Sequence, residues 1–314
     1  MALQFLLSRG WFDQCLDNNR KHFHLKQEIM SRRGTWDDKI VMYRELPTEN
    51  GVLKFHSNGF DYFDFVDTVD LVYEGTIHSI KCYIGGQLCD SFESEDLVTQ
   101  IDTLCSFYSN RRVKTIGTKT VVPLEMFPFH KHNLVSELFC DKQDIRIVVN
   151  DSDTNYKLYG NAYNCDSHLR SVLHDKKEIF NCGIQSIAKT FDVTPGANEC
   201  QLPSGLYHLL YFWGPKIDNV KLMLDKPTAL FDVPSELLEN LKLSLGYTCK
   251  PYVVFFSQDK LEDCGQGFTL PLNPCSINNA RLILETTETA KLHMVMLKIQ
   301  CMQTKNGMSS LLML

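Results

Sequence analysis

The sequence predicts an all-β protein made of two related β-sandwiches and a few short helices, and three observations support this. Most of the 314 residues fall into short segments in which apolar and polar residues alternate, separated by Gly, Pro, Asn and Asp. Helical periodicity is confined to a few stretches. The same order of elements also occurs twice, at an offset of about 140 residues, which indicates two versions of one β unit.

The predicted strands are rich in β-branched and aromatic residues. The clearest examples are residues 80–84, 144–149, 220–224, 252–256 and 280–284. The segment 292–299 is apolar at both its odd and its even positions, a pattern typical of a strand with both faces covered. We therefore expect this strand to lie inside the protein, between two layers.

Three segments are predicted to be helical. Ser94 is a suitable N-cap, and the apolar stripe that follows it predicts a helix over 94–110. A leucine stripe that ends at Gly246 predicts a second helix over 234–245. A third, shorter helix is expected between residues 132 and 140.

The chain divides into an N-terminal arm, residues 1–34, and two β units, residues 35–155 and 156–314. The arm carries six Lys and Arg against three Asp and Glu and is therefore +3, although the whole chain is −6. The boundary after residue 155 follows from residues 150–155, the most turn-like polar run in the sequence. For the arm, a solvated helix that ends at Gly34 and a functional segment that reaches a partner surface are equally supported.

Composition excludes several classes of protein. A net charge of −6 and a pI near 5.9 exclude a strongly basic nucleic-acid binder that acts through bulk charge. The twelve cysteines are expected to be thiols, because disulfide-dense scaffolds are much shorter and carry a signal peptide. No apolar segment reaches the roughly 20 residues of a membrane span. We expect a protein of the cytosol or nucleus that is not secreted through a signal peptide.

The sequence predicts no enzyme, no catalytic or metal-binding residues and no cofactor. Phosphate-binding glycine loops, C-x-x-C pairs, G-x-S-x-G and H-E-x-x-H are all missing from the sequence. His130 and His132 with Cys140 could supply a Cys/His pair. We favour the alternative in which this segment is a polar turn and Cys140 is a small buried residue.

Two aromatic-rich segments, 60–65 and 207–213, suggest either stacking platforms or strands of a core or an interface. Acidic residues interleave the first segment and would repel phosphate, so base stacking fits poorly. We favour core or interface strands for both segments.

Two segments of the first half match known motifs. Residues 80–90 read I-K-C-Y-I-G-G-Q-L-C-D, and residues 122–129 read V-P-L-E-M-F-P-F. They resemble the landmarks I-G-G-Q-x-I-D and I-P-L-x-F-W-F in the first jelly roll of major capsid proteins from large eukaryotic double-stranded DNA viruses. The matching positions are Ile84, Gly85, Gly86, Gln87, Asp90, Pro123, Leu124 and Phe127.

The second half carries two further landmarks of that family. Residues 273–280 resemble its N-F-S-R-I-D-N-A, without the Arg and Asp, and residues 296–311 resemble its C-terminal N-V-L-R-I-x-S-G-M-x-G-L with a short insertion. The positions concerned are Asn273, Ile277, Asn278, Asn279, Gly307, Met308 and Leu311. The chain is thus similar to a compact, divergent member of the lineage of nucleocytoplasmic large DNA viruses and polinton-like viruses.

This resemblance implies two tandem eight-stranded β-jelly-roll sandwiches and a structural role in the virion. Members of the family form homotrimers that act as pseudo-hexameric capsomers and tile an icosahedral capsid, assembled in the host cytoplasm or nucleus. The implied partners are other copies of the chain, neighbouring capsomers and minor capsid proteins, with no small-molecule substrate. The arm would contact an inner membrane, the genome or a neighbouring subunit. A minor capsid protein or assembly scaffold of the same fold is the alternative role.

Contacts between chains are expected on outward-facing residues, on the helices 94–110 and 234–245, and on loops. The candidate interface residues are the aromatic side chains Trp11, Phe12, Phe63, Phe65, Tyr211 and Trp213. A β-sandwich module that binds a carbohydrate or peptide is the competing interpretation. An enzyme built on Cys140 and His130 ranks third.

Overall fold

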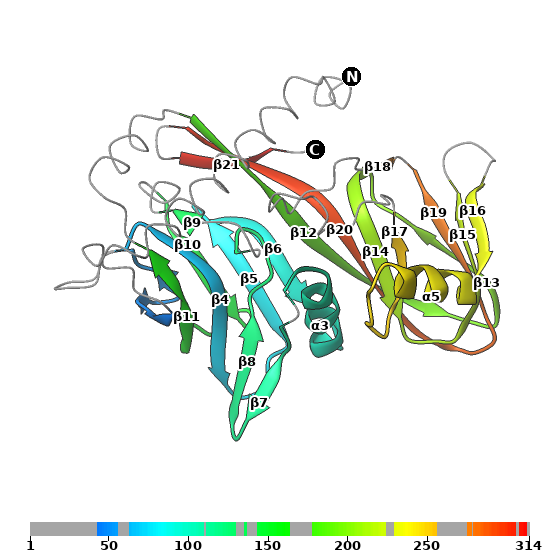
Figure 1. Cartoon of the computed structure of the whole chain (residues 1–314), viewed down its shortest axis with the longest axis horizontal. Coiled ribbons are helices and arrows are strands. Elements are labelled where there is room, and N and C mark those ends of the chain that lie inside the picture. Colours follow the sequence, from blue (N-terminus) through cyan, green and yellow to red (C-terminus); the bar gives the residue numbers. More distant parts are fainter. Residues whose placement is uncertain are drawn as a thin grey trace. The chain divides into compact units, whose positions relative to one another are not determined.

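The computed structural model describes ten stretches of the chain (Figure 1). These are residues 43–55, 63–109, 111–129, 135–136, 143–163, 178–223, 229–255, 275–277, 279–305 and 308–312. They form a mostly β structure with two helices, α3 (Leu97–Tyr108) and α5 (Ser235–Ser244). The predicted fold class, all-β with few short helices, is confirmed.

The first sandwich consists of two antiparallel sheets. One sheet has the order β1 (Arg44–Leu46), β11 (Tyr156–Tyr163), β4 (Phe65–Glu74), β8 (Lys119–Pro123) and β7 (Lys114–Ile116), with β9 (Val135–Ser136) also paired to β4. The other has the order β2 (Thr48–Glu49), β3 (Val52–Leu53), β10 (Ile145–Val149), β5 (Ser79–Ile84) and β6 (Gln87–Glu93). The predicted strands 80–84 and 144–149 are neighbours here, with Ile145 opposite Ile84.

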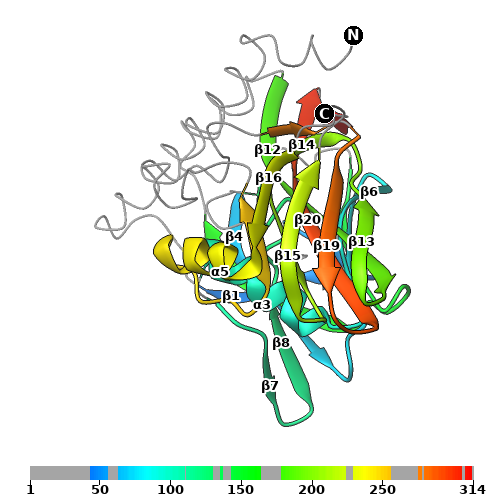
Figure 2. The same ribbon diagram turned by 90° about the vertical axis from the view of Figure 1, so that its right-hand side faces the viewer.

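The second sandwich has the same two-sheet construction. One sheet has the order β12 (Glu178–Val193), β20 (Ala290–Lys305), β14 (Gly205–Trp213) and β17 (Tyr252–Phe255), with β18 (Cys275–Ile277) on β14 and β21 (Met308–Leu312) on β20. The other, seen in Figure 2, has the order β13 (Gly196–Gln201), β19 (Arg281–Thr286), β15 (Ile217–Met223) and β16 (Ala229–Pro234). Without the short strands β18 and β21, each of these two sheets has four strands. The sandwich therefore has eight principal strands, as predicted for a jelly roll.

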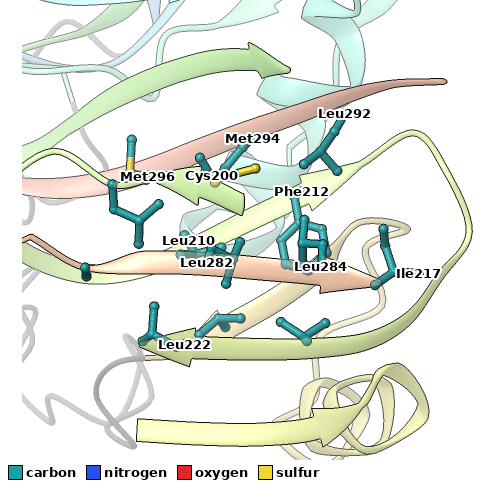
Figure 3. Packing of buried hydrophobic residues seen from close by; sticks show 14 of the residues in the cluster. Cys200, Leu210, Phe212, Ile217, Leu222, Leu282, Leu284, Leu292, Met294 and Met296 are labelled. Atoms are coloured by element: carbon teal, nitrogen blue, oxygen red, sulfur yellow. The ribbon is translucent and has the colours of Figure 1, made fainter. Parts of the chain in front are cut away.

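The core of the second sandwich lies between these two sheets. Figure 3 shows Leu210 and Phe212 of β14 directed toward Leu282 and Leu284 of β19. Along β20, Leu292, Met294 and Met296 belong to this cluster, while Val295, Leu297 and Ile299 are also buried. The prediction that 292–299 is covered on both faces is therefore confirmed.

The helices differ in detail from the sequence prediction. Helix α3 begins at Leu97, and its N-cap is Asp96 instead of Ser94, because the Asp96 carboxylate accepts the Thr99 N–H at 3.1 Å. Helix α5 closely matches the predicted 234–245. The helix expected between residues 132 and 140 is wrong at Val135–Ser136, which pair with β4, and the rest of that segment lies outside the described residues.

The first sandwich extends past the predicted boundary at residue 155. The polar run 150–155 is a turn between β10 and β11, with Asn150 and Asp151 at positive φ, and β11 pairs with both β4 and β1. Among the described residues, those up to Gln185 and from Gln300 onward form one compact unit, and those from Ser186 to Ile299 form the other. The 16-residue strands β12 and β20 contribute to both units.

Candidate assembly surface

The I-G-G-Q motif forms the tight hairpin between β5 and β6. Ile84 and Gln87 are paired, and Gly85 and Gly86 are the two turn residues, with φ values of +57° and +80°. Positive φ at both positions is the geometry of a type I′ turn, which suits the twist of the flanking strands and strongly favours glycine. The motif therefore encodes a backbone conformation, and no ligand is needed to explain it.

Asp90 and Phe127 of the first two motifs meet in the structure. The buried Asp90 carboxylate accepts the Phe127 N–H through Oδ2 at 2.9 Å and the Ser91 N–H through Oδ1 at 2.9 Å. In the same segment, the Leu124 N–H donates to the Val69 carbonyl of β4 at 2.9 Å. Residues 124–129 are thus bound both to β6 in one sheet and to β4 in the other, so these motif positions hold the first sandwich together.

A charge network lies beside this segment. The Arg111 guanidinium forms ion pairs with Asp70 and, at 3.8 Å, with the buried Glu125. The Tyr43 hydroxyl donates to Asp70 Oδ2 at 2.6 Å, and burial together with this bond raises the pKa of Tyr43 above its usual value. A buried carboxylate is tolerated when a cation compensates it, which is what Arg111 does for Glu125.

The motif positions of the second half are only partly described. Ile277 pairs with Gly205 of β14, Asn279 is exposed at a φ of +49°, and Leu311 pairs with Met302. Met308, which begins β21, is exposed. Asn273, Asn278 and Gly307 lie outside the described residues.

Two of the aromatic residues predicted for an interface are core residues. Phe63 is 1% exposed and packs on Phe55, with ring centroids 5.1 Å apart, and Tyr211 is fully buried on the central strand β14. This favours the core over the interface for both, because a side chain buried within its own chain offers no surface to a partner. Trp213 is half-buried between Tyr211 and His293, which stack on it. Trp11, Phe12 and the Phe65 side chain lie outside the described part of the chain.

Of the eight large apolar side chains that are exposed among the described residues, five lie on the two helices or on the hairpin beside α3. Val98 of α3 is 51% exposed, and Ile116, at the end of the neighbouring β7–β8 hairpin, is 68% exposed. On α5, the leucines Leu237, Leu241 and Leu243 are all about half exposed. Large apolar patches on a surface indicate interaction sites. We therefore take these two helix regions, on which contacts between chains were expected from the sequence, as the candidate assembly surface.

Cys89, Cys105 and Cys200 are buried thiols outside any disulfide. Burial raises the pKa of Cys89 to about 12 and that of Cys200 to about 11, and it also raises the pKa of Cys105. Because the thiolate is the reactive form, such thiols are poor nucleophiles at neutral pH. His130, His132 and Cys140, the candidate Cys/His group, lie outside the described residues.

The described residues offer neither a metal-binding cluster of side chains nor a helix suited to span a membrane. They contain no cluster of three or more His, Cys, Asp and Glu side chains arranged to hold a metal ion. No helix among them has both the length and the apolar character to cross a membrane.

Comparison with known proteins gives a clear result for the fold. No family model and no curated protein sequence matches the chain. Among solved structures, PBCV-1 VP54, in a crystal structure fitted into a cryo-EM reconstruction of the virophage Sputnik, matches with a TM-score of 0.62 at 12% identity, over 87% of this chain and 95% of that one. A quasi-atomic model of the PBCV-1 virus capsid matches with a TM-score of 0.58 at 12% identity, over the same shares of the two chains. The tandem jelly-roll fold implied by the sequence resemblance is thereby confirmed.

Proposed function

We propose that this chain is a structural capsid protein, and that its copies associate through their sandwiches to form a viral shell. The observation that carries the proposal is the extent of the fold match, which covers 87% of this chain and 95% of PBCV-1 VP54. Both sandwiches are therefore included in the match. The role is mechanical: the two packed cores keep each sandwich rigid, and the outward faces bind other copies.

The proposed capsomer is a trimer. Three copies of a chain with two similar sandwiches present six similar sides, and a cyclic trimer satisfies its internal contacts while its outer sides stay available for lateral packing. The exposed apolar residues of the α3 and α5 regions are suitable for such contacts, because stable interfaces bury apolar side chains at their centre. Neighbouring capsomers and minor capsid proteins are the further partners that we propose.

Electron microscopy of the purified full-length protein tests this role. We expect uniform blocks with a six-sided outline, which pack laterally as the concentration rises. Single 36.1 kDa particles at every concentration would contradict the proposal. Binding on a glycan array without any self-assembly would favour the carbohydrate-binding module instead.

The N-terminal arm is proposed to act after the trimer has formed. Its charge of +3, in a chain of −6, suits contact with an anionic membrane, the genome or an acidic surface of a neighbouring subunit. Deletion of residues 1–34 should leave the trimer intact and reduce the yield of larger assemblies, measured by sedimentation and microscopy. An unchanged yield of particles would rule out this role for the arm.

A further inference from the structure

A polar pocket lies on the outward face of the sheet β2–β3–β10–β5–β6 in the first sandwich. Tyr83 of β5 and Arg146 of β10 are directly opposite each other, and Val52 of β3 is opposite Arg146 on its other side. The neighbouring Cys82 and Ile147 are fully buried, so Tyr83 and Arg146 point away from the core. The pocket that they line has a volume of about 750 Å³, within the range of roughly 300–1,000 Å³ that is typical of ligand sites.

Three positions of the sequence motifs also line this pocket. Gly85 and Gly86 belong to the β5–β6 turn, and Met308 is the first residue of β21. A Cβ atom on Gly85 would lie 2.6 Å from the side chain of Gln143, so the glycine allows this amide to lie against the turn. Residues from both ends of the described chain therefore contribute to one pocket.

The pocket contains both donors and acceptors of hydrogen bonds. Arg146 is exposed, and within the described part of the chain neither its guanidinium nor the Tyr83 hydroxyl has a hydrogen-bond or ion-pair partner. Gln143 adds an amide, and the exposed Asp144 adds carboxylate oxygens, which only accept. A ligand with several hydroxyl groups, each of which donates and accepts, matches this set.

The charges along the pocket are of both signs. Arg146 is positive, and Asp144 and Asp151 are negative. The Lys81 ammonium donates to Asp151 at 2.7 Å and also pairs with Glu93 at 3.0 Å, so it adds no excess of positive charge. A charged ligand of either sign would lie beside a like charge, which disfavours phosphates, carboxylates and amines. The pocket is therefore best suited to a neutral, polar molecule.

We propose that this pocket binds a short neutral oligosaccharide. Sugar hydroxyls can accept from Arg146 and donate to Asp144. The C–H face of a sugar ring packs on the negative face of an aromatic ring, and Tyr83 supplies that ring. In a shell built as proposed above, many copies of the pocket would act together, and multivalency would make a weak single contact strong. Only this last consequence rests on the proposed function.

A glycan array probed with the labelled full-length protein tests the proposal. We expect binding to a group of neutral glycans, with no gain for glycans that carry sialic acid or sulfate. The strongest neutral glycan is then titrated in its free form by calorimetry. The absence of binding to every neutral glycan would overturn the proposal, and so would binding confined to sialylated or sulfated glycans.

Substitutions in the pocket place the binding on the chain. Tyr83→Ala and Arg146→Ala should each weaken binding of that glycan at least about tenfold, with an unchanged circular dichroism spectrum, because both side chains face outward. Arg146→Lys should weaken it too, because lysine lacks the planar fork that makes two parallel hydrogen bonds. Tyr83→Phe, which keeps the ring, replaces Tyr83→Ala if the latter fails to fold and should show a smaller loss.

Arg112→Ala, at an exposed arginine outside the pocket, is the matched control and should bind like the wild type. Wild-type affinity in Tyr83→Ala and in both Arg146 variants would overturn the proposal, because the sugar would then bind elsewhere on the chain.

The mass of the pocket variants distinguishes this proposal from the proposed function. The pocket lies within one sandwich, so light scattering should give the same mass for Arg146→Ala as for the wild type. A loss of assembly in Arg146→Ala without any loss of glycan binding would make this face a contact between subunits and overturn the sugar site. Glycan binding by a wild-type chain that stays monomeric would support the pocket and contradict the capsid role.

Discussion

Each sandwich has one described helix, but the two helices are held in different ways. Helix α3 places Ile101, Leu104 and Cys105 at full burial and packs on β6 and β8. Helix α5 buries little apolar surface beyond Leu238 and is anchored by the polar contacts of Lys242. The difference indicates that α3 belongs to the core of its own sandwich, whereas the apolar side of α5 is available to another molecule.

A matched pair of leucine truncations tests this difference, and it has the largest expected effect. Leu104→Ala in α3 should lower the free energy of unfolding by about 2–5 kcal/mol, because it removes a fully buried side chain and leaves a cavity. Leu241→Ala in α5 should change it by less than about 0.5 kcal/mol, because the side chain is exposed. Urea unfolding under conditions that keep the chain monomeric gives both values. Equal losses would mean that α5 is also a core helix.

The two sandwiches also differ in the hydrogen-bond and ion-pair partners of their buried titratable side chains. In the first, Asp90 accepts two backbone N–H groups and Glu125 faces Arg111. In the second, His208 is buried on β14, and its Nδ1 has no hydrogen-bond partner in the described structure. The second sandwich should therefore be the more sensitive to acid.

The pH dependence of stability measures that sensitivity. Burial lowers the pKa of His208 from 6.5 to about 4, so between these values the unfolded chain binds a proton that the folded chain excludes. The contribution of His208 is complete above pH 6.5 and is lost as the pH falls toward 4, by at most about 3 kcal/mol. His208→Leu should remove this part of the pH dependence, whereas His78→Gln, at an exposed histidine, should retain it. Parallel curves for wild type and His208→Leu would disprove the assignment.

Removing the Asp90 carboxylate tests the polar connection of the first sandwich. Asp90→Ala leaves the buried Phe127 N–H without an acceptor and should cost about 1–3 kcal/mol in the free energy of unfolding. Asp151→Ala removes a carboxylate that pairs with Lys81 at the surface and should cost less than about 1 kcal/mol. Chemical denaturation of both variants provides the comparison. A loss at Asp90 no larger than that at Asp151 would show that the segment 124–129 is held mainly by its apolar side chains.

Much of the fold could be predicted because its signals are local. Alternation predicts β5 and β10, and a run that is apolar at both odd and even positions predicts β20. The two glycines predict the β5–β6 hairpin, and the order of the motifs indicates the tandem jelly roll. From its composition the polar run 150–155 predicts a linker, because a turn within a sandwich and a linker between sandwiches contain the same types of residue. Only the pairing of β11 with β4, a long-range contact, distinguishes them.

The candidate surface was harder to predict, for a related reason. A leucine stripe shows that a helix has an apolar face but not whether its own chain covers that face, so the contact expected on the helix 234–245 could not be assigned to particular leucines. The aromatic segments show the opposite case. The size and aromatic character of Phe63 and Tyr211 suit an interface as well as a core, and both side chains lie within the core. The position of Lys242 was the sequence signal for this surface. Lys242 follows Leu238 by one turn, so both lie on the same side of α5, and a lysine on the inner side leaves the other leucines to face outward.

The mass of the full-length protein in solution tests the central claim most directly. Light scattering across a concentration series should give about 108 kDa, three times the 36.1 kDa of one chain, and the value should hold on dilution until the trimer dissociates. A constant mass of 36.1 kDa up to the highest attainable concentration would contradict the account.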